Sequence, residues 1–504
     1  MGARIIEVKR QFPGDRAFLA RRITLIVGLF LVISGIGVLA ATAPALGLLL
    51  GFIVGYWLLV VWQPGLLWNV LCFSILASIW LMEWLYFPFL GGQVKISHIL
   101  GVLLSASAIR VIAPYVKYSK ILKATVSLII LAFLSALWSV SPAQTLSSAV
   151  LPAILALTSL GMAAVTYNEP GRLIPRFVKT VEILSFVTVG LSLLQFLSVQ
   201  LIGQPSFLLS DLAKPIIEES NLIGVSDRQY QLLVDFGRPS GLFIEPDHLG
   251  FYLMWSFLLL LPFAERPDGR IHRVAVSAIA MGLLLSQTRA AWMGAFFGLI
   301  IYFLVNVKKL GKTFRSGPPI VAGLVFIIAI TFSLGFHSNL AARVAQFFDP
   351  YATAGSLSSG AFRLATMRFM WEYVTNNMKS LLVGNGWGTL EWFTEPLIHS
   401  PGPEANFIGW GNYGPNLFLN FMFNLGLIGL ALCLYISCKA TFSSWKRLRL
   451  VTNDYHKQFV LGLLLTLVGM TISFQVAGVQ VSLPPWWLTI CFLGAFEAHT
   501  NLKK

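Results

Sequence analysis

Long apolar runs separated by short polar segments dominate the pattern of this chain. Each run approaches the ~20 residues that an α-helix needs to cross a bilayer. The pattern predicts an all-α polytopic membrane protein with about fourteen transmembrane helices. The expected spans lie near residues 23–42, 45–62, 66–89, 96–115, 121–139, 145–166, 177–202, 248–263, 272–287, 290–306, 319–336, 413–437, 459–479 and 483–498.

The placement of Lys and Arg then predicts how these spans are oriented. With a cytoplasmic N-terminus, the segments on the cytoplasmic side hold 26 of the 36 Lys and Arg residues. Basic residues concentrate in the cytoplasmic loops of membrane proteins, so both termini are expected in the cytoplasm. The net charge of +15 is therefore a topology signal, with attraction to anionic lipid as a secondary role, and it does not indicate a nucleic-acid partner.

Composition supports a membrane protein and excludes several kinds of site. Hydrophobic residues make up 56% of the chain and charged residues 11%, against about 25% charged in a soluble domain. The four cysteines (Cys72, Cys433, Cys438 and Cys491) all lie in apolar segments. Neither a disulfide framework nor a zinc site is indicated, and no metal or other cofactor is expected.

Two long loops are expected on the outer side, at residues 203–247 and 337–412. They divide the chain into residues 1–336 with eleven spans, the large loop 337–412, and residues 413–504 with three spans. The pattern at 361–377 predicts a helix inside the large loop. The glycine-rich run 384–388 then breaks it, and no helical pattern is evident after that run.

The stretch from Arg238 to Gly250 brings one cation, two carboxylates and an imidazole to the boundary between an outer loop and a span. Pro246 is typical of a first helical position, so a helix is predicted to start there. Glu245 and Asp247 would lie at its positive end. A purely structural interpretation, a well-capped membrane helix beside an interfacial arginine, remains open.

Further polar residues are expected on the same side. Arg289 lies in a tight turn between two spans, and the large loop carries Arg363, Arg368 and His399. Arginine binds phosphate in a bidentate manner and keeps its charge in poorly hydrated sites. The group suits a substrate with a lipid tail and a diphosphate, with a carboxylate or His accepting a proton. Alternatively, Arg289 anchors a turn, Arg363 and Arg368 are solvated helix-face charges, and His399 is a surface residue.

Four passages together resemble the bacterial O-antigen polymerase/O-antigen ligase superfamily of membrane glycosyltransferases. Each is weak alone, but their order, spacing and side of the membrane agree. They are Trp-Ser-Val-Ser-Pro at 138–142, Arg238 to Gly250, Gln-Thr-Arg-Ala-Ala at 287–291, and the segment that runs from Arg363 through Trp371 and 384–388 to 416–429.

The resemblance implies a GT-C-like architecture and an undecaprenyl-diphosphate-linked glycan as donor, used at the outer (periplasmic) face of the cytoplasmic membrane without a metal. The family's two loop arginines correspond to Arg238 and Arg363. Ligases carry a His before the Asn that corresponds to Asn416, whereas here Pro415 stands there. A polymerase that joins repeat units into O-antigen or exopolysaccharide is therefore favoured, with Glu245 as the preferred base and Asp247 second.

Other roles and partners follow from the same resemblance. A chain-length regulator protein is a possible partner besides membrane lipid. Two alternatives stay open: a ligase that transfers glycan to lipid A core or protein, and a polysaccharide or lipid transporter or flippase. The residues expected to bind diphosphate or glycan are Arg289, His248, Arg368, Asn416, Trp387 and His399.

Overall fold

The computed structural model describes the helical parts of the chain. The described residues are 63–81, 86–89, 92–206, 237–243, 245–266, 269–306, 359–398, 414–477 and 482–502, together with residues 56, 208, 230, 233 and 234. The chain falls into two units, Met1–Asn69 and Val70–Lys504. Nearly all of the described residues belong to the second unit, to which the following paragraphs refer.

Helices follow one another with short connections, as the apolar pattern predicted. Several begin with proline in the first turn, where the missing N–H costs no hydrogen bond; α7, α8 and α11 are examples. Others begin after a Ser or Asn whose side chain accepts a backbone N–H, such as Ser119 before α6 and Asn416 before α20. The helices are α3 (Pro64–Leu81), α4 (Ile96–Ser107), α5 (Ile109–Tyr118), α6 (Lys120–Leu134), α7 (Pro142–Asn168), α8 (Pro170–Leu197), α11 (Pro246–Leu260), α12 (Arg270–Ser286), α13 (Arg289–Asn306), α17 (Ser359–Asn376), α18 (Met378–Val383), α19 (Leu390–Ile398), α20 (Leu417–Leu448), α21 (Asp454–Ser473) and α22 (Pro484–Leu502), with the shorter turns η1 (Ser135–Leu137), η2 (Ser198–Ile202) and η4 (Leu261–Glu265).

The expected count of fourteen transmembrane helices is not supported. Within the described residues, seven helices are long and apolar enough to cross a membrane, or eight if the pair α4 and α5, bent by 82°, is one span. At the predicted ninth and fourteenth spans, α12 and α22 carry charged or polar residues at one end, which shortens the apolar part below the ~20 residues required. The expected spans 23–42 and 319–336, and nearly all of 45–62, lie outside the described residues.

The helical class is confirmed with one exception. Residues Tyr86–Phe89 (β1) and Gly92–Lys95 (β2) pair as a short antiparallel ribbon, with Tyr86 opposite Lys95. The apolar run expected near 66–89 therefore ends as a helix at Leu81 rather than continuing to Phe89. Pro88 within β1 has no N–H for a helical hydrogen bond, which is consistent with an extended backbone there.

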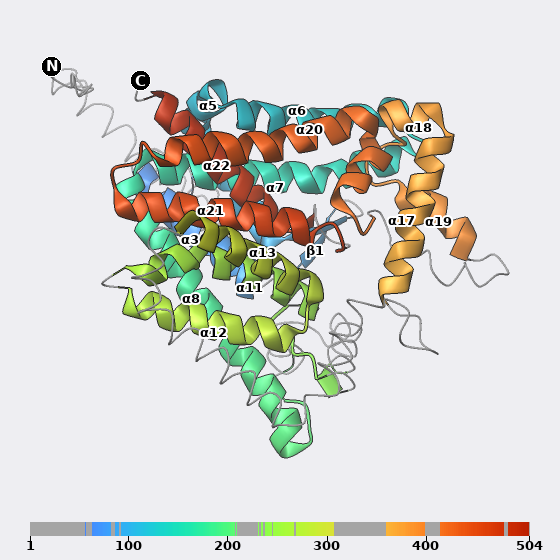
Figure 1. Cartoon of the computed structure of the whole chain (residues 1–504). Coiled ribbons are helices and arrows are strands. Elements are labelled where there is room, and N and C mark those ends of the chain that lie inside the picture. Colours follow the sequence, from blue (N-terminus) through green and yellow to red (C-terminus); the bar gives the residue numbers. More distant parts are fainter. Residues whose placement is uncertain are drawn as a thin grey trace, which may run out of the picture. The chain divides into compact units, whose positions relative to one another are not determined.

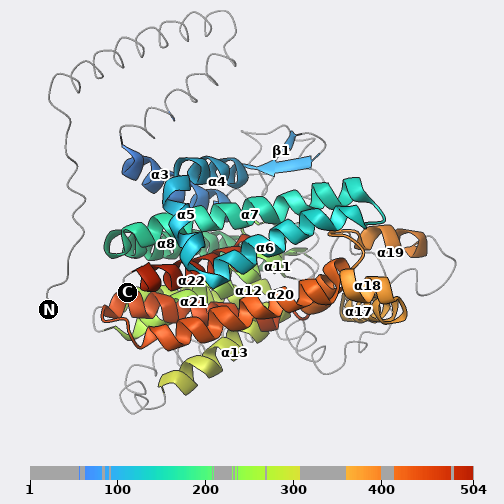
Figure 2. The same ribbon diagram turned by 90° about the horizontal axis from the view of Figure 1, so that it is seen from above.

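The centre of the second unit is a layer of long helices that run side by side, in which α20, α21, α22 and α7 can be followed in both views (Figures 1 and 2). α22 packs against α5, α6, α7, α20 and α21, and most of its residues are buried. α11 packs against α12, α13 and α21. It is almost wholly enclosed, so the helix that carries the candidate site lies in the interior rather than at the edge.

Contacts gather the predicted cytoplasmic segments at one end of this unit. Glu497 near the end of α22 accepts hydrogen bonds from the backbone N–H groups of Lys120 and Ile121 and pairs with Arg447 near the end of α20. Arg266 after α11 stacks on Tyr455 at the start of α21. These contacts join the ends of α20 and α22 to the start of α6, and the chain after α11 to the start of α21.

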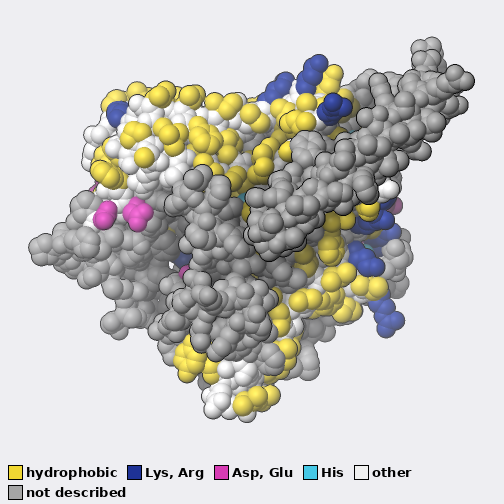
Figure 3. All heavy atoms as spheres, turned by 180° about the vertical axis from the view of Figure 1, so that it is seen from behind, with side chains coloured by type: hydrophobic (Ala, Val, Ile, Leu, Met, Phe, Trp, Pro, Cys, Tyr) yellow, Lys and Arg dark blue, Asp and Glu magenta, His cyan; other side chains and the backbone are white. Residues whose placement is uncertain are grey.

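The surface is apolar over wide areas, as expected for helices that face lipid. Figure 3 shows the molecule from behind. Hydrophobic side chains cover much of the described part of this face, and Lys and Arg lie mostly on the right side of the view. Large apolar side chains such as Phe73, Phe296 and Phe442 are more than half exposed. In a soluble protein such area would be unusual, whereas a bilayer covers it.

Three shorter helices, α17, α18 and α19, lie together at the other end, beside the start of α20 (Figures 1 and 2). The predicted helix 361–377 is confirmed as α17. The expectation that no helix follows the glycine run is wrong, because α19 begins at Leu390, directly after it.

The glycine run joins these helices to α20. Gly426 has a left-handed φ of 65° inside α20, and the backbone carbonyls of Phe423 and Asn424, in the turn before it, accept hydrogen bonds from the N–H groups of Asn385 and Gly386, each at 3.0 Å. A Cβ on Gly384 would lie 2.3 Å from the Asn424 carbonyl oxygen, so only glycine fits this approach. The break in α20 therefore provides the docking point for α17–α19.

The Trp-Ser-x-x-Pro turn completes this junction from the opposite side. The Nε1–H of Trp138 donates to the Val383 carbonyl at 2.9 Å, and Gln144 Nε2 donates to the Gly388 carbonyl at 3.1 Å. The Trp-Ser-x-x-Pro turn and the glycine run thus meet in space, and their contacts here hold helices together.

Candidate functional site

One carboxylate and two arginines from distant parts of the chain meet at the start of α11. Asp247 Oδ1 lies 2.7 Å from Arg238 Nη2, and Asp247 Oδ2 lies 3.6 Å from Arg363 Nη2. The side chains of Arg238 and Arg363 are 11% and 18% exposed. Such partly enclosed charges interact more strongly than pairs at the surface, where water screens them.

The loop before α11 is shaped to place Arg238. Gly237 and Gly241 both have a left-handed φ of 59°, which bends the chain tightly around the arginine. Gln195 in α8 accepts hydrogen bonds from the N–H groups of Ser240 and Gly241, and donates to the Gly241 carbonyl at 2.9 Å. This buried amide fixes the loop against the helix bundle.

The turn between α12 and α13 contacts both Arg238 and Asp247. Gln287 has a left-handed φ of 52°, which is rare for a residue other than glycine. It closes α12 and directs the Ser286 carbonyl to Arg238 Nε, at 3.2 Å. Thr288 Oγ1 lies 3.0 Å from the Pro246 carbonyl and 3.2 Å from Asp247 Oδ1. The turn therefore holds both members of the Arg238–Asp247 pair.

Arg289 adds a third guanidinium. It is the first residue of α13 and interacts electrostatically with Arg363, Asp247 and Arg238. Among the described residues, three arginines thus interact with the Asp247 carboxylate, so the positive charges of this cluster outnumber the one negative charge that they share. An anionic group from a substrate would balance that excess, and guanidinium groups suit phosphate oxygens.

Arg363 reaches this cluster from the first turns of α17. Its Nη1 donates to the Val476 carbonyl at 2.9 Å, at the end of α21. The same side chain therefore links the large loop to two membrane helices. The position of α17 depends on the glycine junction described above, so the junction sets where the arginine points.

Glu245 directly precedes the helix that carries Asp247. The predicted helix start at Pro246 is confirmed, with Glu245 as the residue before it and Asp247 in the first turn. The Glu245 side chain makes no capping hydrogen bond to the helix and is partly exposed. Asp247 forms ion pairs with two arginines, and Glu245 precedes it by two positions in the chain.

Several of the expected binding residues have other surroundings. Arg368 is 82% exposed and pairs with Glu372 on the surface of α17, at 2.7 Å. Asn416 caps α20 through Leu419 N–H and donates to the Gln475 carbonyl at 3.0 Å. Trp387 is 1% exposed and packs on Phe421. These contacts favour structural roles for the three residues, and His399 lies outside the described residues.

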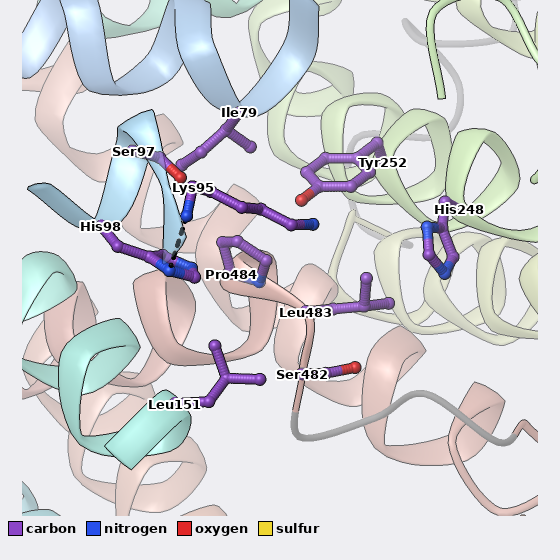
Figure 4. Close-up of a pocket in the computed structure, with 10 residues that line it drawn as sticks. All are labelled: Ile79, Lys95, Ser97, His98, Leu151, His248, Tyr252, Ser482, Leu483 and Pro484. Atoms are coloured by element: carbon purple, nitrogen blue, oxygen red, sulfur yellow. Dashed lines mark hydrogen bonds between the residues drawn. The ribbon is translucent and has the colours of Figure 1, made fainter. Parts of the chain in front are cut away.

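His248 lies in a different environment from the arginines. It lines a cavity together with Lys95, His98 and Tyr252 (Figure 4). Within the described residues, no group of His, Cys, Asp and Glu is arranged to hold a metal ion.

Sequence reasoning missed several residues that build the site. Thr288 belongs to the motif at 287–291, but the sequence does not indicate that its hydroxyl lies within hydrogen-bond distance of the Pro246 carbonyl and of Asp247 Oδ1. Gln195 and Lys95 were not considered. Each had a signal, since Gln195 is a polar residue within an apolar span and Lys95 is a lone cation between two expected spans.

Comparison with known families agrees with the resemblance. Residues 274–434 match the family model Wzy_C, described as O-antigen ligase, which is about a third of the chain. The matched range holds Arg289, Arg363 and the glycine run, while Arg238, Glu245 and Asp247 lie just before it. No curated protein matches the chain.

Proposed function

We propose that this chain, which carries an O-antigen ligase family domain at residues 274–434, polymerises undecaprenyl-diphosphate-linked oligosaccharide repeat units into O-antigen or exopolysaccharide. The site would face the outer side of the bacterial cytoplasmic membrane, with both termini in the cytoplasm. The helical architecture is GT-C-like in this proposal. A chain-length regulator is a candidate partner.

The observation that carries the proposal is the gathering of Arg238, Arg363 and Arg289 around Asp247. When a glycosidic bond forms from a lipid diphosphate sugar, the bond between the anomeric carbon and a phosphate oxygen breaks. Negative charge then grows on the departing diphosphate. Preorganised guanidinium groups stabilise that charge in the transition state more than in the ground state, which lowers the barrier.

Two carboxylates divide the remaining work in this proposal. Asp247 orients the two arginines through the ion pairs at 2.7 and 3.6 Å, and an engaged carboxylate is a poor proton acceptor. Glu245 accepts the proton from the attacking sugar hydroxyl. Glu245 directly precedes α11, and its side chain makes no capping hydrogen bond to that helix.

A ligase is the second candidate, because the matched family model is described as O-antigen ligase. It would transfer a finished glycan to lipid A core or to protein. Against it stands Pro415, which occupies the position where ligases carry a histidine.

Purified protein incubated with lipid-linked repeat units alone separates the two functions. A polymerase produces a ladder of products that differ by one repeat unit. If products form only after a distinct acceptor is added, the polymerase proposal fails and the ligase takes its place. If lipid-linked glycan merely moves between leaflets and no bond forms, neither enzyme function holds.

A further inference from the structure

A polar cavity lies beside the first turn of α11, and His248 of that turn lines it. It has a volume of about 80 Å³, roughly the space of five water molecules at ~15 Å³ each. That space suits a phosphate-sized group better than a sugar ring. Its lining residues come from five parts of the second unit: α3, the β2–α4 segment, α7, α11 and the chain at the start of α22.

Nitrogen-bearing side chains enter this cavity from three elements. Lys95 ends β2, His98 belongs to α4 and His248 to α11; Figure 4 shows the Lys95 side chain extending towards Tyr252 and His248. His98 Nδ1 accepts a hydrogen bond from the Lys95 backbone N–H at 3.3 Å. The neutral imidazole therefore carries its proton on Nε2, which leaves this nitrogen a donor.

The lining favours an anion over a cation or a neutral sugar. It combines Lys95, two histidines, one tyrosine and two serines, and none of the lining residues that the structure describes is Asp or Glu. Lysine is a compact charge that suits phosphate, and hydroxyl groups complete the coordination of phosphate oxygens. The remaining wall is apolar, formed by Ile79, Leu151 and Leu483 together with Pro484. A phosphate that carries a hydrocarbon tail fits both halves of this lining.

The cavity adjoins the arginine cluster through consecutive residues. Asp247 binds the arginines, His248 lines the cavity, and the two side chains interact electrostatically. The first turn of α11 thus separates two cationic sites. One carries an aspartate that orients its arginines, and the described lining of the other is basic, polar and apolar.

We propose that the Lys95 pocket binds the phosphate group of a second lipid-linked molecule, the one whose diphosphate is retained in the product. This inference rests on the proposed function. Joining two lipid-linked glycans brings two diphosphates to the protein, and only one of them leaves. The arginine cluster receives the leaving diphosphate, and the Lys95 pocket holds the other.

Stoichiometry of lipid diphosphate binding tests the inference. Native mass spectrometry of the full chain in detergent, titrated with farnesyl diphosphate, should show two bound molecules for the wild type. Lys95→Gln should bind one, with at least a tenfold weaker second event, while Lys95→Arg should keep two. Lys123→Gln, which removes an exposed lysine of α6, is the matched control and should also keep two.

Each arm has a decisive outcome. Two undiminished sites in a folded Lys95→Gln protein, or a single site in the wild type, would overturn the inference. Inorganic pyrophosphate that binds the Lys95-dependent site as tightly as farnesyl diphosphate would indicate a free anion instead of a lipid, and farnesol that competes equally would exclude phosphate recognition. If Arg363→Gln keeps both sites while Lys95→Gln loses one, the pocket stands and the arginine role in the proposed function fails.

Discussion

Arg363 of α17 lies 3.6 Å from Asp247 of α11, between Nη2 and Oδ2. The two residues are separated by more than a hundred positions, and the helix that carries Arg363 is docked through the glycine junction on α20. Their meeting makes the charge at the start of α11 depend on how the large loop packs. Substrate binding and loop position are therefore coupled in this account.

Arg238→Lys should impair the site although it keeps the charge. Arg238 uses Nε for the Ser286 carbonyl and Nη2 for Asp247, at 3.2 and 2.7 Å. A lysine side chain ends in one compact ammonium group, so it can contact only one of these two partners at a time. We expect polymer synthesis to fall by about 100-fold, the lower end of the range for the loss of one donor that stabilises developing charge. Initial rates with lipid-linked repeat units measure this, and a rate equal to wild type would contradict the role of the guanidinium fork.

The two carboxylates should respond differently to amide substitution. Glu245→Gln removes the proposed base, so the chemical step should slow by about 100-fold or more while lipid diphosphate binding stays unchanged. Asp247→Asn leaves the arginines without their counter-charge, so binding and thermal stability should change as well. Single-turnover rates, together with farnesyl diphosphate binding, distinguish the two effects.

The opposite pattern would reassign the base. A near-normal chemical step in Glu245→Gln, together with intact binding and a lost chemical step in Asp247→Asn, identifies Asp247 as the proton acceptor. Equal and small effects in both variants would remove carboxylate base catalysis from the account.

Thr288→Val should destabilise the site because it removes one hydroxyl group. Thr288 Oγ1 lies within hydrogen-bond distance of the Pro246 carbonyl and Asp247 Oδ1, and a buried hydrogen bond of this kind contributes about 1 kcal/mol. Valine keeps the shape, so we expect a loss of stability near that value and a moderate fall in rate. Thr288→Ser retains the hydroxyl and should behave close to wild type. Thermal unfolding and initial rates check both, and an unchanged Val variant would show that the contact is dispensable.

Gly384→Ala should disrupt the docking of α17–α19. The added Cβ would lie 2.3 Å from the Asn424 carbonyl oxygen, and φ is +78°. Overpacking costs about 1–3 kcal/mol and the left-handed backbone about 1–2 more. Because Arg363 depends on this junction, activity should fall together with stability.

Gly190→Ala is the matched control for that substitution. Gly190 lies within α8, and an added Cβ meets nothing within 4 Å. Alanine favours a helix interior by up to ~1 kcal/mol over glycine, so thermal stability should hold or rise. Equal losses in Gly190→Ala and Gly384→Ala would show that the junction has no special sensitivity.

The helical class and several helix starts were predictable because they depend on local chemistry. The apolar runs form helices, and α11 begins at Pro246 as predicted. α12 ends at the polar turn before Arg289, where the apolar run stops. The number of spans was not predictable in this way. The bend of 82° between α4 and α5 and the ribbon before α4 arise from packing, which hydropathy along the chain does not record.

The candidate site was predictable in its residues but not in its pairings. Arg238, Asp247 and Arg363 stood out as ionisable groups at one predicted face, yet the sequence favoured Glu245 and gave no sign that Asp247 holds both arginines. Arg368 was expected to bind diphosphate or glycan, but five positions along a helix turn its side chain to a different face from Arg363, where it pairs with Glu372. Such distinctions require the tertiary structure.

Polymer synthesis by Arg363→Gln tests the central claim most directly, measured as the product ladder formed from lipid-linked repeat units alone. Arg368→Gln, an exposed arginine of the same helix, matches the loss of charge. We predict that Arg363→Gln, as a folded protein, loses the ladder by about 100-fold or more, while Arg368→Gln keeps it. Ladders of equal length and yield from both variants would contradict the assignment of the arginine cluster to the diphosphate.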